Sequence, residues 1–312
     1  MHLYQHTLAR SISCTGIGLH SGKRVNMVMR PAEPDTGIVF KRTDLKNSPL
    51  IPGDVYNVVD TMFCTTVGKD RATVSTVEHL LSALAGMQVD NAIIEVDAPE
   101  IPIMDGSSTS FIFLIRNAGL ATQAKARQFY VVKREVLLED DDKMVKVTPS
   151  ANMELTIDFS IEFDHPAIRS QHMSFTLNDG GYAREVSRAR TFGFLADMRK
   201  LHEAGLALGG SLENAVVLDE FNVINKDGLR FKDEFVRHKV LDFVGDLALV
   251  GRPVVGHFTA HKSGHDFNNK LFRKLLADPQ AWQLVNGQQL QGQAEKRKRV
   301  PQMGRVAAGA RV

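Results

Sequence analysis

The sequence predicts an α+β fold in about two domains. The chain has 312 residues, and a domain typically takes about 100–200 residues. Hydrophobic residues make up 43% of the chain and charged residues 24%, as in ordinary globular proteins, which argues against global disorder. Strand-like and helix-like segments mix in both halves without strict alternation, and this favours α+β over a doubly wound sheet.

The first half of the chain contains short strands and two helices. Alternating apolar side chains predict strands, and apolar side chains three and four residues apart predict helices. The expected strands are 24–30, 38–40 and 91–96, and the expected helices are 75–87, with Gly86 as a stop signal, and 111–118. Residues 98–110 are rich in Pro, Gly, Asp and Ser, which is typical of a loop.

A polar, alanine-rich stretch at 121–128 is the weakest joint in the chain, and we place the domain boundary there. This gives a first domain over 1–126 and a second over 127–287. The clearest strand of the second domain is 153–163, where apolar residues occupy every second position, a pattern that buries one face of a sheet. Further strands are expected at 129–132, 143–147, 215–218 and 254–260, and helices at 195–204, 233–249 and 268–284, the last one interrupted near Pro279.

The last residues differ in composition. The segment 288–312 is rich in Gln, Gly, Lys, Arg and Ala, which predicts a disordered tail. Residues 291–312 carry six Lys or Arg side chains against the single acid Glu295, so the remaining chain is slightly acidic although the net charge is +2. An acidic body argues against a nucleic-acid-binding core. The basic tail could contact nucleic acid or an anionic membrane surface, with a solvated end as the default interpretation.

The cysteine count and the apolar runs bear on the compartment. Cys14 and Cys64 are too few for a disulfide framework, and free thiols suit a reducing environment. The N-terminus lacks the apolar core of a signal peptide. No uncharged apolar run approaches the roughly 18 residues of a membrane span. Together these observations predict a soluble cytoplasmic protein.

The predicted helix at 233–249 carries chemically active side chains. His238, Asp242 and Asp246 are spaced by four, so they stack along one helix face. An imidazole and a carboxylate placed in this way can share a zinc ion, at about 2.0–2.2 Å from each. On this segment alone the simpler interpretation is a metal-free His–Asp helix pair, worth about 0.2–0.5 kcal/mol.

Glu78 and His79 lie side by side at the start of the helix at 75–87. His79 could bind a metal ion while Glu78 takes a proton from metal-bound water. The alternative is a capping box, in which Glu78 reaches back to the backbone N–H of Ser75. The local sequence favours neither interpretation, and the two are compatible.

His265 follows the strand at 254–260 and a Ser-Gly turn, and active-site groups often lie on loops at strand ends. A surface histidine is the simpler interpretation of a lone His here, and His257 and His261 lie close by. Leucines and glycines at 195–210 could line an apolar slot, although core packing explains them too.

Several of these segments, taken together, resemble one family. They are TVEHL at 76–80, DAPEIPIMDGS at 97–107, FDHPAI at 163–168, SRARTFGF at 187–194, GLALGGS at 205–211, DGLRFKDEFVRHKVLD at 227–242 and KSGH at 262–265. In this order they resemble the UDP-3-O-acyl-N-acetylglucosamine deacetylases, zinc amidases of the committed step of lipid A biosynthesis in Gram-negative bacteria. The resemblance runs from about residue 5 to residue 284. It implies two similar α+β domains, each a sheet layered against helices, with the active site between them.

The resemblance also assigns roles to the residues at the matching positions. The implied zinc ligands are His79, His238 and Asp242. Glu78 would be the general base, and His265, oriented by Asp246, the general acid and electrostatic partner. Thr191 would steady the oxyanion. The substrate-binding residues would be Lys239 and Phe163 for the nucleotide sugar, and Phe192, Phe194, Leu201, Leu208 and Gly210 for the acyl chain.

The expected reaction hydrolyses the N-acetyl group to give UDP-3-O-acyl-glucosamine and acetate. A three-ligand zinc ion keeps a position for water and lowers its pKa to about 7; ferrous iron is an alternative in the cell. The expected partner is the acylated UDP-sugar, with no nucleic acid, and the protein is expected to be a monomer. Two alternatives stay open: a non-catalytic nucleotide-sugar binding protein on the same scaffold, and a nucleic-acid-binding adaptor that uses the tail. Glu78 and His265 argue against the binding protein, because it needs neither.

Overall fold

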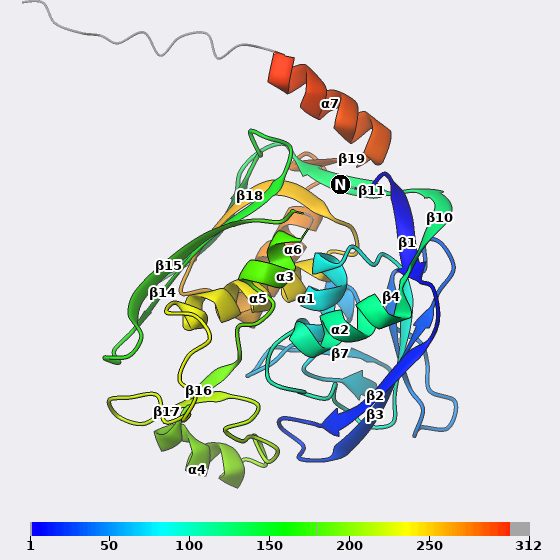
Figure 1. Ribbon diagram of the computed structural model, residues 1–312. Coiled ribbons are helices and arrows are strands. Elements are labelled where there is room, and N and C mark those ends of the chain that lie inside the picture. The colour runs from blue at the N-terminus through cyan, green and yellow to red at the C-terminus, as the bar shows by residue number, and fades with distance from the viewer. Residues whose placement is uncertain (1, 179, 300–312) are drawn as a thin grey trace, which may run out of the picture.

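The computed structural model describes residues 2–178 and 180–299. Two β-sheets lie on the outside of the molecule, with helices between them (Figure 1). The first sheet has the strand order β2-β3-β9-β4-β5. Its strands are β2 (Ile12–Ile17), β3 (Arg24–Pro31), β4 (Ile38–Arg42), β5 (Ile51–Pro52) and β9 (Ala92–Val96). Helices α1 (Glu78–Gly86) and α2 (Thr109–Ala118) cover its inner face.

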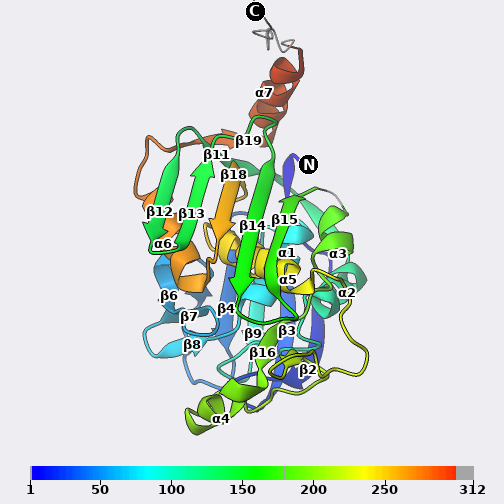
Figure 2. The same cartoon turned by 90° about the vertical axis from the view of Figure 1, so that its left-hand side faces the viewer.

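The second sheet faces the viewer in Figure 2, with α5 and α6 behind it. Its strands are β11 (Gln128–Val132), β12 (Val136–Asp140), β13 (Lys143–Thr148), β14 (Leu155–Phe163), β15 (Arg169–Thr176), β18 (Val254–His261) and β19 (Trp282–Asn286). The covering helices are α5 (Glu234–Ala248) and α6 (His265–Leu276). The alternating strand β14 turns Ile157, Phe159 and Ile161 into the core, where Phe159 contacts Phe243 of α5. The alternating sequence pattern therefore correctly predicts a strand with one buried face.

The five strands of the first sheet and five of the seven strands of the second share one topology. In the first, β2-β3 and β3-β9 pair antiparallel, β9-β4 pair parallel, and β4-β5 pair antiparallel. In the second, β12-β13, β13-β18, β18-β14 and β14-β15 repeat these four pairings in the same order. The helix before the central strand is α1 in the first and α5 in the second, and the helix after it is α2 or α6. The predicted α+β fold of two similar layered domains is confirmed.

Helices α1 and α5 pack against each other in the middle layer, where the two domains meet. The Ser82 hydroxyl of α1 donates a hydrogen bond to the Leu241 carbonyl of α5 at 2.7 Å. Gly245 faces the main chain of Glu78, and an added Cβ there would lie 2.0 Å from the Glu78 carbonyl oxygen. A glycine is therefore needed for the helices to approach so closely.

Each domain carries an insertion outside its sheet. In the first, η1 (Val55–Asn57) leads into a three-stranded sheet of β6 (Val58–Asp60), β7 (Thr66–Lys69) and β8 (Ala72–Val74). In the second, β16 (Phe192–Phe194) and β17 (Val216–Leu218) pair in parallel and flank α4 (Leu195–Glu203), with α3 (Gly181–Glu185) just before them. Both insertions lie in the lower half of Figure 2. No residue of α4 is buried.

Two predicted segments differ from the structure. The stretch at 121–128, interpreted as a polar joint, is largely strand β10 (Leu120–Ala126), which pairs antiparallel with β1 (Tyr4–Leu8); this pairing satisfies backbone hydrogen bonds of the polar stretch. The helix expected over 268–284 begins earlier, at His265, and ends at Leu276. Asp278 and Pro279 turn the chain there, and Leu284 lies in β19 beside Tyr130. The chain leaves β10 at Ala126 and enters the second sheet at β11, and a domain boundary near residue 126 stays a proposal.

The prediction of a disordered tail over 288–312 is wrong for its first part. Helix α7 covers Gly287–Arg299. It is held because Leu290 is buried against Phe129, Met153 and Val285, and because Arg297 donates a hydrogen bond to the Ser150 carbonyl at 2.7 Å. Residues 300–312 lie outside the described part of the chain. Among the described residues, no helix combines the length and apolarity that crossing a membrane requires.

Candidate metal centre and active site

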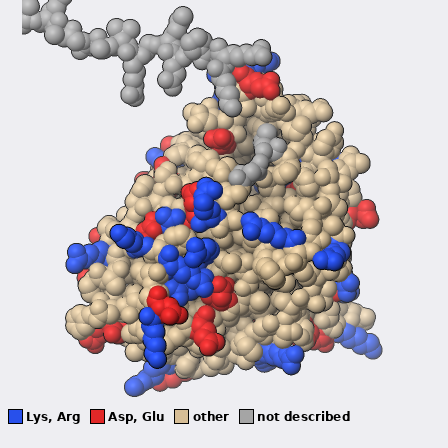
Figure 3. All heavy atoms as spheres, viewed as in Figure 1, with Lys and Arg blue, Asp and Glu red and all other residues tan. Residues whose placement is uncertain are grey.

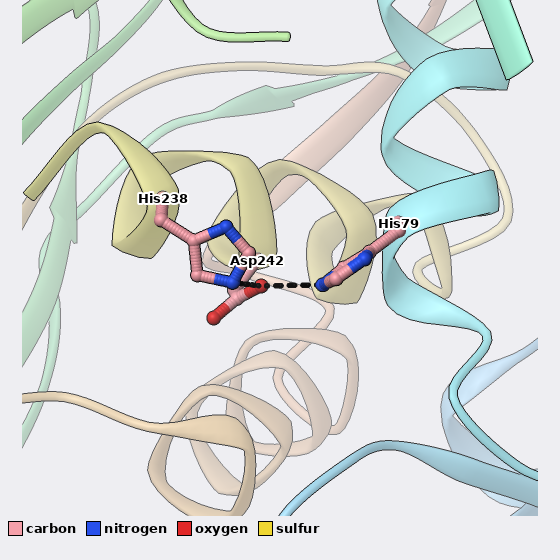
Figure 4. Close-up of side chains that lie close together, drawn as sticks. All are labelled: His79, His238 and Asp242. Carbon is pink, nitrogen blue, oxygen red and sulfur yellow. Dashed lines mark ion pairs between the residues drawn. The ribbon is translucent and has the colours of Figure 1, made fainter. Parts of the chain in front are cut away.

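Three side chains converge where α1 meets α5 (Figure 4). His79 is the second residue of α1, and His238 and Asp242 lie one turn apart on α5. The Asp242 Oδ1 atom is 3.5 Å from His79 Nε2 and 3.3 Å from His238 Nε2. One ligand atom from each residue lies within 4.8 Å of the other two. The close contact at Gly245 is what brings the ligands of the two domains together.

The chemistry of these three residues fits a divalent metal ion. All three are buried, and Asp242 Oδ1 has no hydrogen-bond partner among the residues that the structure describes. The Nδ1–H of His238 donates to the Ala189 carbonyl at 3.1 Å, which leaves Nε2 unprotonated and free to bind a metal. Burial lowers the pKa of His238 to about 3, so this imidazole is neutral. Two imidazoles and one carboxylate are a typical ligand set of catalytic zinc.

Glu78 is buried at the first turn of α1, next to the metal-ligand set. Its Oε2 accepts a hydrogen bond from the Thr65 N–H at 3.1 Å. Burial raises the pKa of its carboxyl group, against the opposing effect of His265. The capping-box interpretation is wrong: α1 has Val77 at its N-cap, and the Ser75 N–H donates to the Pro99 carbonyl instead. Glu78 therefore does not cap the helix on which it lies.

His265 is the first residue of α6 and is mostly buried, so it is not a surface histidine. Its Nδ1 lies 2.8 Å from Asp246 Oδ2, and its Nε2 lies 3.9 Å from Glu78 Oε1. Burial acts to lower the pKa of His265, but the Asp246 carboxylate outweighs it and raises the pKa to about 9. The structure thus places a protonated imidazole opposite a carboxylate, beside the candidate metal centre.

An aromatic cluster adjoins the same centre. The Phe192 ring is 6.3 Å from the His238 ring and 5.7 Å from that of Phe163, and Phe163 is 6.0 Å from Phe194. The Lys239 ammonium lies 3.0 Å from Asp242 Oδ2 and 5.7 Å from the Phe192 ring centre. Burial would raise the pKa of the Asp242 carboxyl, but neighbouring groups, among them the Lys239 ammonium, hold it well below its usual range.

The other expected site residues lie around the α4 insertion. Thr191 is half-buried just before β16, and its N–H donates to the Gly106 carbonyl at 2.8 Å. Leu201 is on α4, while Leu208 is 53% exposed on the following loop. That loop lies against the first domain, because the Leu208 and Gly209 N–H groups donate to the carbonyls of His20 and Leu19. Gly210 closes a turn to the Ala207 carbonyl.

Two residues near the candidate metal centre were not among the predicted site residues. Thr65 and Asn268 both donate hydrogen bonds to Asp246, at 2.7 and 2.8 Å. Asn268 lies three residues after His265 on the same helix, so its spacing is a signal that could have found it. Thr65 gave no signal, because it reaches Asp246 only through the docking of the first domain on the second.

Comparison with known proteins agrees with this geometry. A family model described as LpxC, UDP-3-O-acyl N-acetylglycosamine deacetylase, matches residues 5–277. The chain is 50% identical over 281 residues to a Myxococcus xanthus protein, covering 90% of this chain and 89% of that one. It is 49% identical to a Syntrophus aciditrophicus protein, with 95% and 94% covered, and 50% identical to a Haemophilus influenzae protein, with 96% of each covered. All three are named UDP-3-O-acyl-N-acetylglucosamine deacetylase. The resemblance in the motifs is thereby confirmed, and the chain belongs to the UDP-3-O-acyl-N-acetylglucosamine deacetylase family.

Proposed function

We propose that this chain hydrolyses the N-acetyl group of UDP-3-O-acyl-N-acetylglucosamine, releasing acetate and UDP-3-O-acyl-glucosamine for lipid A synthesis. The observation that carries the proposal is the meeting of His79, His238 and Asp242 beside the opposed pair Glu78 and His265. Family membership over nearly the whole chain supports the substrate class.

The three ligands would hold one zinc ion, with ferrous iron as the alternative in the cell. When bound, such an ion polarises the amide carbonyl and acidifies water. An amide is a poor electrophile, so both effects would lower the barrier to attack by water. The neutral state of His238, with its Nδ1–H given to Ala189, supports this use of the ligand set.

The remaining residues handle protons and charge. Ionised Glu78 accepts the proton of the attacking water, as a buried general base can. Protonated His265, held by Asp246, donates its Nε2–H toward the charge that develops on the substrate. The Thr191 hydroxyl steadies the oxyanion. The amine that leaves takes a proton from His265 or from the newly protonated Glu78.

Substrate binding falls to the aromatic cluster and the α4 insertion. Lys239 neutralises part of the nucleotide diphosphate, and Phe163 lies near the uracil ring. Phe192, Phe194, Leu201, Leu208 and Gly210 line the passage for the acyl chain. The exposed apolar side chains around α4 support an apolar ligand there, since Leu195, Leu208 and Leu212 are all about half exposed.

The deciding experiment measures acetate release from UDP-3-O-acyl-N-acetylglucosamine by chelator-stripped protein, before and after one equivalent of zinc is added. We expect activity only after the addition; parallel repletion with ferrous iron ranks the two metals. Folded, zinc-loaded protein that binds UDP but releases no acetate would favour the alternative of a nucleotide-sugar binding protein.

Compartment and partners follow from the same proposal. Both cysteines, Cys14 and Cys64, are free thiols, which supports a reducing cytoplasm. We propose a monomer, since ligands from one chain complete the metal-ligand set.

On the face shown in Figure 3, Lys and Arg side chains lie among Asp and Glu side chains. We also propose that the basic C-terminal segment makes a weak contact with a membrane surface. Liposome co-sedimentation of the protein with and without residues 291–312 tests this contact.

A further inference from the structure

Thr65 hydrogen-bonds to two carboxylates of the candidate site, those of Glu78 and Asp246. It immediately precedes β7 in the insertion of the first domain and is 2% exposed. Its N–H donates to Glu78 Oε2 at 3.1 Å, and its hydroxyl donates to Asp246 Oδ1 at 2.7 Å. Glu78 is on α1 and Asp246 is on α5. One residue therefore fixes a carboxylate from each domain.

The Asp246 carboxylate depends on such donors because it is buried. A buried ionised carboxylate is costly unless hydrogen bonds replace its water. Its Oδ2 atom pairs with His265 Nδ1 and with Asn268 Nδ2, both at 2.8 Å. The donor to its Oδ1 atom is the Thr65 hydroxyl. The plane of the carboxylate, and with it the direction of the His265 ring, is thus set from both ends.

The position of Thr65 is itself fixed. Its carbonyl accepts a hydrogen bond from the Val77 N–H at 3.3 Å, just before α1 begins. The neighbouring Cys64 is buried, and Phe63 adopts a left-handed backbone with φ of 66°. The main-chain N–H and carbonyl of Thr65 are therefore both hydrogen-bonded at the start of α1, which fixes the backbone from which the hydroxyl reaches Asp246.

We propose that Thr65 is a positioning residue that aligns His265 with Glu78 by holding Asp246 across the domain interface. The proposal rests on the roles proposed above for Glu78, His265 and Asp246. The proposal predicts that loss of the Thr65 hydroxyl lowers kcat and leaves KM nearly unchanged. The reason is that Asp246 orients His265, whose positive charge stabilises the charge that develops on the substrate during the reaction.

The test compares variants of the zinc-loaded enzyme. Thr65→Val keeps the shape and the N–H bond to Glu78 but removes the hydroxyl. A hydrogen bond to a charged group is worth enough for about a 10- to 100-fold fall in kcat, with KM within about twofold and one zinc ion retained. Thr65→Ser, which restores the hydroxyl, brings kcat back to within about threefold. Thr66→Val is the matched control, because the Thr66 hydroxyl faces Cys64 Sγ at 3.9 Å; its kcat stays unchanged.

A double-mutant cycle separates alignment from simple packing. If Thr65 acts through Asp246, Thr65→Val costs less than about twofold in an Asp246→Asn background. An equal loss in both backgrounds, or an unchanged kcat in Thr65→Val alone, overturns the proposal. Full kcat in Asp246→Asn refutes the role given to Asp246 itself, which is a separate failure. Should Thr65→Val not fold, Thr65→Ala removes the same hydroxyl and enters the same cycle.

Discussion

Gly245 of α5 packs on the main chain of Glu78 in α1, so closely that a methyl group in its place would lie 2.0 Å from the Glu78 carbonyl oxygen. Gly245 follows the ligand Asp242 by three residues, and Glu78 directly precedes the ligand His79. The contact therefore sets the separation between ligands that come from different domains. The metal-ligand set depends on a residue that has no side chain of its own.

Gly245→Ala is expected to force α1 and α5 apart. Overpacking of this kind costs about 1–3 kcal/mol, and the displacement separates His79 from Asp242. We expect a lower Tm and weaker zinc binding, measured by calorimetry and by competition with a chelator. Gly292→Ala, where a Cβ meets no atom of residues 2–178 or 180–299 within 4 Å, is the control and keeps its zinc affinity. Full zinc affinity in Gly245→Ala would show that helix spacing does not limit the site.

His79→Ala and Glu78→Gln are expected to fail in different ways. Loss of His79 removes a metal ligand, so bound zinc falls well below one equivalent. Glu78→Gln keeps the ligands and loses the base, so zinc stays while kcat falls by about 10²–10⁴-fold. Zinc content and acetate release on the same preparations distinguish the two. One tightly bound zinc ion in His79→Ala would show that the ligand set is wrong.

The pH profile should report His265. Its pKa is raised to about 9 by Asp246, against the effect of burial, so the imidazole is protonated below that pH. We expect kcat/KM to hold through neutral pH and to fall as pH rises through about 9. Asp246→Asn removes the charge that raises the pKa, so its basic limb moves to lower pH. A basic limb that Asp246→Asn leaves in place would assign it to another group.

Phe163→Ala tests the nucleotide contact. The Phe163 ring packs against Phe192 and Phe194, and an aromatic contact is worth about 0.5–1.5 kcal/mol. We expect KM to rise by about 2- to 10-fold while kcat is kept, measured by initial rates. Phe221→Ala, at a ring that is 66% exposed, leaves both constants unchanged. A fall in kcat at constant KM would place Phe163 in the chemistry and not in binding.

The sequence predicted the site better than its surroundings. The spacing of His238, Asp242 and Asp246 put three side chains on one face of a predicted helix, and that helix is α5. Glu78, His79 and His265 could be joined to them only through a family resemblance. Periodicity describes one element at a time, and it holds no information about which elements dock.

The misjudged segments have physical causes. Residues 121–128 appeared to be a joint because their side chains are polar, but β10 is held by its backbone pairing with β1. The segment after 287 appeared disordered by composition, yet Leu290 anchors α7 in an apolar pocket. Thr65 could not be predicted either, because its hydrogen bond to Asp246 joins residues that are 181 positions apart in the sequence. Composition averages over the few side chains that decide such outcomes.

The repeated topology of the two sheets bears on the asymmetry of the site. One copy of the repeated unit could bring two such helices together only as a homodimer, and two-fold symmetry would then impose the same side chains on both helices. In the present chain the first helix carries Glu78 and His79 at its start, while the second carries His238 and Asp242 in its middle. Because both units lie in one polypeptide, that symmetry does not constrain the two helices. The first helix can supply a general base and one metal ligand, while the second supplies two metal ligands.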